Sequence, residues 1–188
     1  MSALSSTEVL DQLTGSYHLD PAHTRLGFAV RYALVTRVHG WFDSFDGRLH
    51  LDASDPTRCS VALTIDAASI QTNNVDRDAH LRSGDFFDVE RYPTITFEST
   101  DVQALANRRY RVTGDLTIKA TTRPVDVDLT YSGSCVDPYR QLRVGIEGAA
   151  SLKRSEWGLT WNVALEAGGL VLSDRIDLEL DLSAIKVD

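Results

Sequence analysis

The amino-acid sequence predicts an all-β protein, a single up-and-down antiparallel β-barrel of about eight strands. From Thr94 onward the chain alternates apolar and polar residues almost without a break, which is the two-residue period of a strand with one buried face. Several alternating stretches run about ten residues or more, which is longer than typical sandwich strands and favours a tall barrel. No strand is followed by a helix and a second parallel strand, which argues against an α/β fold.

The composition fits one globular domain. The chain has 188 residues, of which 43% are hydrophobic and 24% charged. The net charge of -8 argues against nucleic acid or an anionic membrane as the main partner, because both attract basic patches. No apolar run is long enough to cross a bilayer, so we expect no integral membrane segment.

Residues 1–14 are predicted to form an N-terminal extension, and residues 15–188 the barrel domain. Ser5–Leu13 has the pattern of a short amphipathic helix that Gly15 ends. The first residues show neither a basic stretch nor an apolar core of a secretory signal, so we expect a cytoplasmic protein. An exposed helix of this kind could also pair two copies, which makes a homodimer a further expectation.

The first half of the barrel is predicted to contain four strands. They are expected at Tyr17–Asp20, Arg25–Tyr32, Val38–Leu51 and Ser60–Asp66. The third of these carries Gly40 and Gly47, and interior glycines often mark a bend or bulge. A barrel that closes on itself needs such corners.

The second half is predicted to contain longer strands. They are expected at Thr94–Leu105, Tyr110–Lys119, Val125–Tyr131, Leu142–Ile146 and Leu170–Leu182. In the first of them the apolar residues change from odd to even positions, which predicts a bulge near Ser99–Asp101.

Ser69–Pro93 is the one long segment that does not read as a strand. Asn73 or Asn74 can cap a short helix at about residues 74–82, and Ser83-Gly84 can end it. The segment combines charged side chains with aromatic ones. This combination suits a cover over one end of an apolar cavity, and it equally suits a solvated connection between two strands.

Several motifs in this order resemble the YceI family. They are Leu19-Asp20-Pro21-Ala22-His23-Thr24, Val38-His39-Gly40-Trp41-Phe42, Thr72 to Ser83 (TNNVDRDAHLRS), Asp85-Phe86-Phe87-Asp88-Val89, Tyr92 to Phe97 (YPTITF) and Gly114 to Lys119 (GDLTIK). The resemblance spans roughly Gly15 to Leu182. It implies a lipocalin-like barrel that holds a long apolar ligand, typically a polyisoprenoid. The chain departs from the family at Tyr32, where a histidine is frequent, and at Ala120, where a glycine is frequent.

The candidate binding residues divide into a head group and a tail group. Arg77 and His80 are expected to meet an anionic or carbonyl head, with Asp78 orienting one of them; these positions fall in the run that resembles the family. Trp157 and Trp161 are expected either to plug the barrel floor or to line the cavity mouth. The residues expected to contact an apolar tail are Phe28, Val30, Phe42, Leu63, Phe87, Phe97, Leu116, Ile118, Leu129, Ile146, Trp157 and Trp161.

The sequence contains no recognisable catalytic or metal-binding motif, so we expect neither a catalytic residue nor a metal, and no cofactor other than a bound lipid. The favoured hypothesis is non-enzymatic binding, storage or transport of a polyisoprenoid such as a polyprenyl pyrophosphate or a quinone. One isoprene unit contributes roughly 3–4 kcal/mol when buried, so about four units can offset an association cost of about 4–15 kcal/mol. The alternatives are a small enzyme that uses Asp78 and His80 on such a lipid, and a solidly packed barrel with an interaction role.

Overall fold

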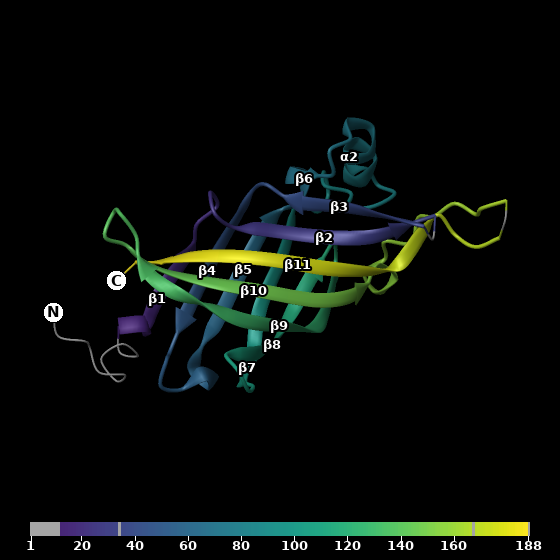
Figure 1. Cartoon of the computed structure of the whole chain (residues 1–188). Coiled ribbons are helices and arrows are strands. Elements are labelled where there is room, and N and C mark those ends of the chain that lie inside the picture. The colour runs from purple at the N-terminus through teal and green to yellow at the C-terminus, as the bar shows by residue number, and fades with distance from the viewer. Residues whose placement is uncertain (1–11, 34, 167, 188) are drawn as a thin grey trace.

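A computed structural model of the chain describes residues 12–33, 35–166 and 168–187. Eight antiparallel strands form a closed ring, and Figure 1 shows the resulting barrel. In order around the ring they are β1 (Gly15–Leu19), β4 (Phe45–Leu51), β5 (Ser60–Asp66), β7 (Thr94–Ala104), β8 (Arg109–Ile118), β9 (Thr121–Val136), β10 (Leu142–Lys153) and β11 (Leu172–Lys186). The predicted lipocalin-like β-barrel is therefore confirmed.

The last strand both closes the ring and carries a branch. The C-terminal end of β11 pairs with β1, where Tyr17 lies opposite Lys186. The N-terminal part of β11 pairs instead with β2 (Arg25–Tyr32), which continues the sheet through β3 (Thr36–Phe42) to β6 (Ile70–Gln71). The strand order is thus consecutive from β7 to β11 but not among the first strands.

The predicted helix near residues 74–82 is confirmed as α2 (Val75–Arg82). The Asn74 side chain caps it, because its Oδ1 accepts a hydrogen bond of 2.9 Å from the Arg77 N–H. The described residues also form short 3-10 turns at η1 (Pro56–Arg58), η2 (Ala67–Ser69) and η3 (Arg154–Trp157). Most of the predicted N-terminal helix lies outside the described residues, and the homodimer expected from it stays a prediction.

The predicted single strand Val38–Leu51 is wrong, because the structure divides it into β3 and β4. Asp43 and Ser44 turn the chain between them, and the Trp41 Nε1–H donates to the Asp43 carboxylate at 2.6 Å. The two strands have different neighbours, since β3 joins β2 and β6 while β4 joins β1 and β5. The apolar side chains also change from even to odd positions across this turn, which is the sequence signal of the break.

Two local predictions on strand geometry have clear outcomes. The bulge in β7 is confirmed, because its register against β8 shifts between Ser99 and Asp101. Gly40 does not mark a bulge, since β2 and β3 stay in register there with Gly40 opposite Phe28. A Cβ at Gly40 would approach the Phe28 ring to 2.3 Å, so this position needs glycine for packing.

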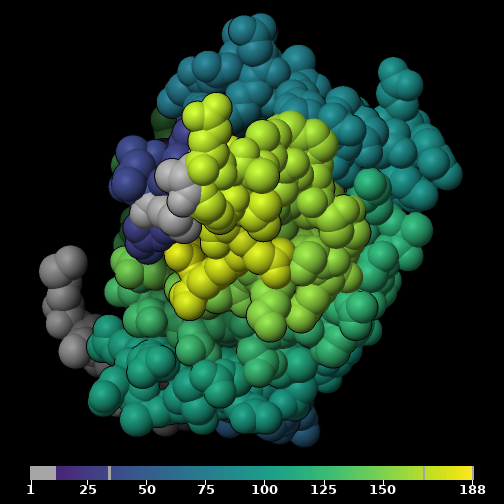
Figure 2. All heavy atoms as spheres, turned by 90° about the vertical axis from the view of Figure 1, so that its right-hand side faces the viewer, coloured from purple at the N-terminus to yellow at the C-terminus, as the bar shows by residue number. Residues whose placement is uncertain are grey.

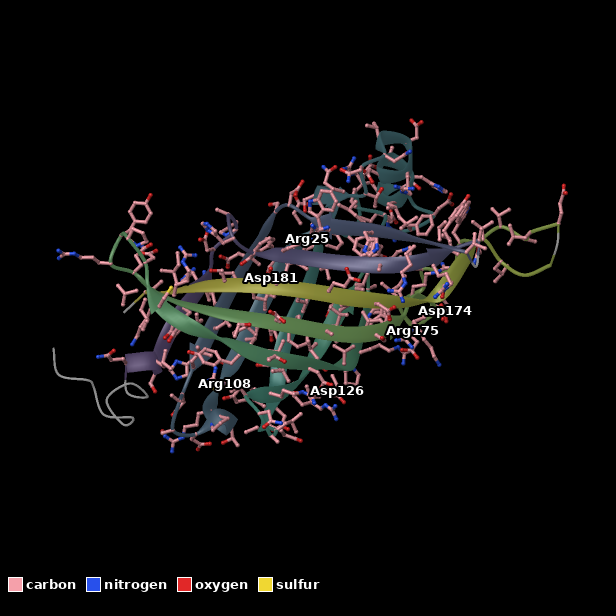
Figure 3. All side chains as sticks on the ribbon, viewed as in Figure 1. Arg25, Arg108, Asp126, Asp174, Arg175 and Asp181 are labelled. Atoms are coloured by element: carbon pink, nitrogen blue, oxygen red, sulfur yellow. The ribbon has the colours of Figure 1, made fainter. Side chains whose placement is uncertain are left out.

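Charged side chains cover the outside of the barrel and apolar side chains fill the inside. Figure 3 shows Arg175 and Asp181 of β11 and Asp126 of β9 on the outer surface. Two buried apolar clusters share the interior, one around Ile65, Ile118 and Trp157 and the other around Leu49, Val144 and Ile146. The interior is therefore divided along the barrel axis.

A charged cluster joins the connection between β1 and β2 to β10 and to the β9–β10 connection. The Asp20 carboxylate accepts hydrogen bonds from Arg143 Nη1 at 2.5 Å and from the Ala22 N–H at 3.0 Å, and it contacts His23 Nδ1 at 2.7 Å. Arg143 Nη2 also donates to Asp137 at 3.3 Å. The Arg143 hydrogen bond, followed by the bonds from His23 and Ala22, lowers the pKa of Asp20 to about 2 although partial burial opposes the shift.

We expect Asp20→Asn to lower the free energy of unfolding by about 1–2 kcal/mol at neutral pH. Because the folded protein holds the pKa of Asp20 at about 2, its contribution is present above the ordinary carboxyl pKa and is lost as pH falls toward 2. Urea denaturation between neutral pH and pH 2 measures this, and the two proteins should converge at the acid end. Asp46→Asn, at an exposed pair with Arg48, is the control and should change little. A constant difference at all pH values would contradict the account.

Candidate functional site

A cavity of about 640 Å³ occupies one end of the barrel. Much of its wall comes from strands β2, β3 and β11, from α2 with the segment that follows it, and from η3 with the segment that leads to β11. Strands β5, β6, β7, β8 and β10 each add one lining residue. Figure 2 looks onto this end, where the yellow-green segment before β11 covers the centre and the blue-teal segment around α2 lies above it. Residues of Ser69–Pro93 therefore do line one end of an apolar cavity.

Seven of the residues expected to contact an apolar tail line this cavity. They are Phe28, Val30, Phe42, Phe87, Ile118, Trp157 and Trp161. Aromatic rings make up much of this wall, with the Phe42 ring 6.0 Å from both the Phe28 and Phe87 rings. Trp157 is buried, and its Nε1–H donates to the Leu116 carbonyl at 3.1 Å. Both tryptophans therefore line the cavity, as expected whether they plug the barrel floor or line the cavity mouth.

Five residues expected to contact the tail lie outside the lining of this cavity. Leu63, Phe97 and Leu116 belong to the packed core beneath it. Leu129 and Ile146 line a second cavity of about 180 Å³ farther along the barrel. Alternation identified these side chains as inward-facing, but it contains no information on their depth along the barrel axis.

The three residues expected to meet a lipid head take different positions. Arg77 and His80 line the cavity, whereas Asp78 is buried beside it and accepts a hydrogen bond of 2.5 Å from the Thr72 hydroxyl. The same hydroxyl accepts from Arg77 Nε at 2.7 Å, and the Thr72 carbonyl accepts from Arg77 Nη2 at 2.7 Å. Asp78 therefore orients Arg77 through Thr72, and Arg77 Nη1 has no hydrogen-bond partner within the described ranges.

His80 lies against aromatic rings at the cavity wall. Its ring stands edge-on to Trp161, with centroids 4.6 Å apart, and to Phe86 at 5.1 Å. Its Nε2 pairs with the Asp85 carboxylate at 2.8 Å, not with Asp78. The His80–Asp78 pair considered from the sequence is therefore absent from the structure. The segment before β11 contacts α2 directly through the His80 and Trp161 rings.

Arg154 is a functional candidate that the sequence did not indicate. It lines the cavity and is only 7% exposed, and it donates to the carbonyls of Leu159, of Trp161 at 2.9 Å and of Ser173 at 3.0 Å. Burial lowers the pKa of its guanidinium. In the part of the chain that the structure describes, Nη2 makes no hydrogen bond and the side chain forms no ion pair with a carboxylate.

The site thus combines a large apolar surface with a few oriented donors. Arg77 and Arg154 each leave one nitrogen without a partner among the described residues. The cavity lining also includes the carboxylate of Asp76, which is exposed to solvent. Among the described residues no group of histidine, cysteine or carboxylate side chains could hold a metal ion. The arrangement can bury a hydrocarbon chain and donate hydrogen bonds to oxygen atoms at its end.

Comparison with known proteins decides the family. The family model of the YceI-like domain matches residues 17–184. The chain belongs to the YceI-like family. A UPF0312 protein of Pseudomonas aeruginosa is 33% identical over 176 residues, covering 93% of this chain and 88% of the relative. A UPF0312 protein of Staphylococcus aureus is 35% identical over 165 residues, covering 87% and 94%. The family that the sequence motifs indicated is therefore confirmed.

Solved structures share the fold of this YceI-like protein. BcnA of Burkholderia cenocepacia superposes with a TM-score of 0.76 at 23% identity, covering 88% of this chain and 98% of BcnA. The YceI protein of Campylobacter jejuni gives 0.73 at 27% identity, covering 90% and 97%. A polyisoprenoid binding domain from Saccharophagus degradans gives 0.66 at 17% identity, covering 91% and 98%. No helix within the described ranges has the length and hydrophobicity of a membrane span.

Proposed function

We propose that this YceI-like protein binds a long-chain isoprenoid lipid inside its barrel, with the oxygen-bearing head at Arg77, His80 and Arg154. The observation that carries the proposal is the apolar cavity of about 640 Å³, whose donors are gathered on α2 and around η3. Storage or transport of the lipid is the biological role that such binding would serve. The similar fold of a domain named as polyisoprenoid-binding supports the ligand class.

The energetics of the cavity favour a long tail. Each CH₂ group moved from water to an apolar site contributes about 0.8 kcal/mol. Association costs an estimated 4–15 kcal/mol, so several isoprene units are needed before the complex is stable. The aromatic and aliphatic wall offers this burial without any polar contact along the tail.

The donors favour a head that accepts hydrogen bonds. A buried cation without a carboxylate partner is costly, and a ligand oxygen or phosphate would reduce that cost. Thr72 and Asp78 hold Arg77 in place before a ligand arrives, so little side-chain entropy remains to be lost. The two arginines that each keep one nitrogen without a partner among the described residues are linked through Trp161, whose ring contacts His80 of the Arg77 helix and whose carbonyl accepts from Arg154 Nη1 at 2.9 Å.

An enzyme acting on the same lipid has less support. That hypothesis joined Asp78 and His80 as an acid–base pair. Asp78 bonds to Thr72 and His80 to Asp85, so each already has a different partner. We therefore propose a non-enzymatic binding protein, and turnover of a bound isoprenoid that His80→Ala abolishes would overturn this part.

We expect Arg77→Met to weaken binding of a polyprenyl phosphate by about 10- to 100-fold, since a hydrogen bond to a charged group contributes about 1.5–3 kcal/mol. Binding of the bare hydrocarbon with the same tail should change much less. Fluorescence titration with both ligands gives the ratio of phosphate affinity to hydrocarbon affinity. A general destabilisation of the protein would weaken binding of both ligands and leave this ratio unchanged.

Arg82→Met is the matched control, because Arg82 lies on the same helix but does not line the cavity, and its guanidinium donates to the Ala68 and Ile70 carbonyls. Its ratio of phosphate to hydrocarbon affinity should equal that of the unchanged protein. Equal losses for the two ligands in Arg77→Met would contradict the role of Arg77.

A further inference from the structure

Among the described residues, two cavities lie along the barrel interior with apolar side chains between them. The first has about 640 Å³ and the second about 180 Å³. Four side chains pack against both buried clusters, and one of them, Leu129, also lines the second cavity. We call these four the dividing layer: Phe45, Leu63, Leu129 and Leu182. All four lie outside the lining of the first cavity.

Single strands show the same order along the barrel. On β5, Ile65 lines the first cavity, Leu63 belongs to the dividing layer and Val61 lines the second cavity. These three residues are spaced by two positions and therefore face the same side of the strand. On β8, Ile118 lines the first cavity and Val112 the second, and the buried Leu116 comes between them. Both strands thus place at least one inward-facing side chain between the residues that line the two cavities.

Leu129 of the layer packs closely against β10. A Cβ at Gly148 of β10 would approach Leu129 Cδ2 to 2.8 Å and Leu180 Cδ1 to 3.1 Å, so the missing side chain of Gly148 makes room for both leucines. A lipid tail that enters the first cavity from the α2 end meets this layer as a floor. To extend farther, the tail must displace these side chains from their contacts with both clusters, which is unfavourable.

We infer that the dividing layer sets the longest isoprenoid tail that the barrel can bury, and that Leu63 and Leu129 are its length-determining residues. This inference rests on the proposed function. Each additional CH₂ should raise affinity about fourfold while it still finds space in the first cavity. Affinity should stop rising once the tail reaches the layer. Opening the layer would join the second cavity to the first and admit a longer tail.

The test is an affinity profile over polyprenyl phosphates of increasing length, from geranyl upward, measured by native mass spectrometry. The unchanged protein should show rising affinity that levels off at a defined length. In Leu63→Ala the levelling point should move to a longer lipid, with about tenfold tighter binding of the first lipid beyond the original limit. Leu129→Ala should shift the profile in the same direction and provides a second reading if one variant does not fold.

Leu26→Ala is the control, because Leu26 is more deeply buried than Leu63 and Leu129 but packs in the first cluster and lines neither cavity. It should lose stability without changing the levelling point. An unchanged profile in the folded Leu63 and Leu129 variants, or an equal shift in Leu26→Ala, would overturn the inference while leaving the proposed function intact. Failure of every lipid to bind the unchanged protein would instead overturn the proposed function.

Discussion

We expect Val30→Trp to bind a long-chain polyprenyl lipid about a hundredfold more weakly than the unchanged protein. Val30 lies in β2 between Ile176 of β11 and Val38 of β3, and all three side chains line the cavity. An indole at this position takes the space of about four CH₂ groups, whose burial contributes about 3 kcal/mol in total. This corresponds to about a hundredfold in affinity. Fluorescence titration with a polyprenyl phosphate measures the change.

The control for this variant is the same substitution outside the cavity. Val136 lies near the end of β9 and is 66% exposed, so Val136→Trp should leave lipid affinity unchanged. Val30→Trp should fold as well as the unchanged protein, because it fills empty space. Undiminished affinity in a folded Val30→Trp protein would mean that the lipid binds elsewhere.

Trp157→Ala should lower the free energy of unfolding by about 3–5 kcal/mol, the usual cost of removing a buried large aromatic side chain. Trp157 is 2% exposed, packs in the larger buried cluster and donates to the Leu116 carbonyl at 3.1 Å. The substitution therefore enlarges the cavity and removes a buried hydrogen bond at the same time. Urea denaturation monitored by circular dichroism measures the loss.

Trp41→Ala is the comparison for that loss. Trp41 is half-buried, its Nε1–H donates to Asp43, and Arg25 lies 5.0 Å above its ring. We expect it to cost about 1 kcal/mol. If Trp157→Ala cost no more than Trp41→Ala, Trp157 would not be the core residue that its burial indicates.

The fold could be predicted because alternation reports directly which side chains face inward. The change of phase at Ser99–Asp101 located the β7 bulge for the same reason. A similar change at Asp43–Ser44 marks the turn between β3 and β4, but the prediction of one long strand overlooked it. The signal was present in the sequence, and the alternating residues on both sides masked it.

The site could be predicted only in part. Arg77 and His80 lie in a segment whose composition sets it apart from the strands, so the sequence indicated them. Arg154 gave no comparable signal, because its burial depends on the carbonyls of Leu159, Trp161 and Ser173, which tertiary packing brings together.

The position of a side chain along the barrel axis could not be predicted from an alternation with a period of two residues. Leu63 and Ile65 read identically in the sequence, yet Ile65 lines the first cavity and Leu63 belongs to the dividing layer. Which inward-facing residues meet a ligand follows from the register between strands, which alternation alone does not fix.

The most direct test of lipid binding in the barrel is native mass spectrometry of the protein purified from its own host, with Val30→Trp prepared in parallel. We expect the unchanged protein to carry a bound species that organic extraction releases and fragmentation identifies as an isoprenoid. Val30→Trp should carry much less of it. A ligand-free mass for the unchanged protein, with no uptake of added polyprenyl phosphate, would contradict lipid binding and leave the barrel without its proposed ligand.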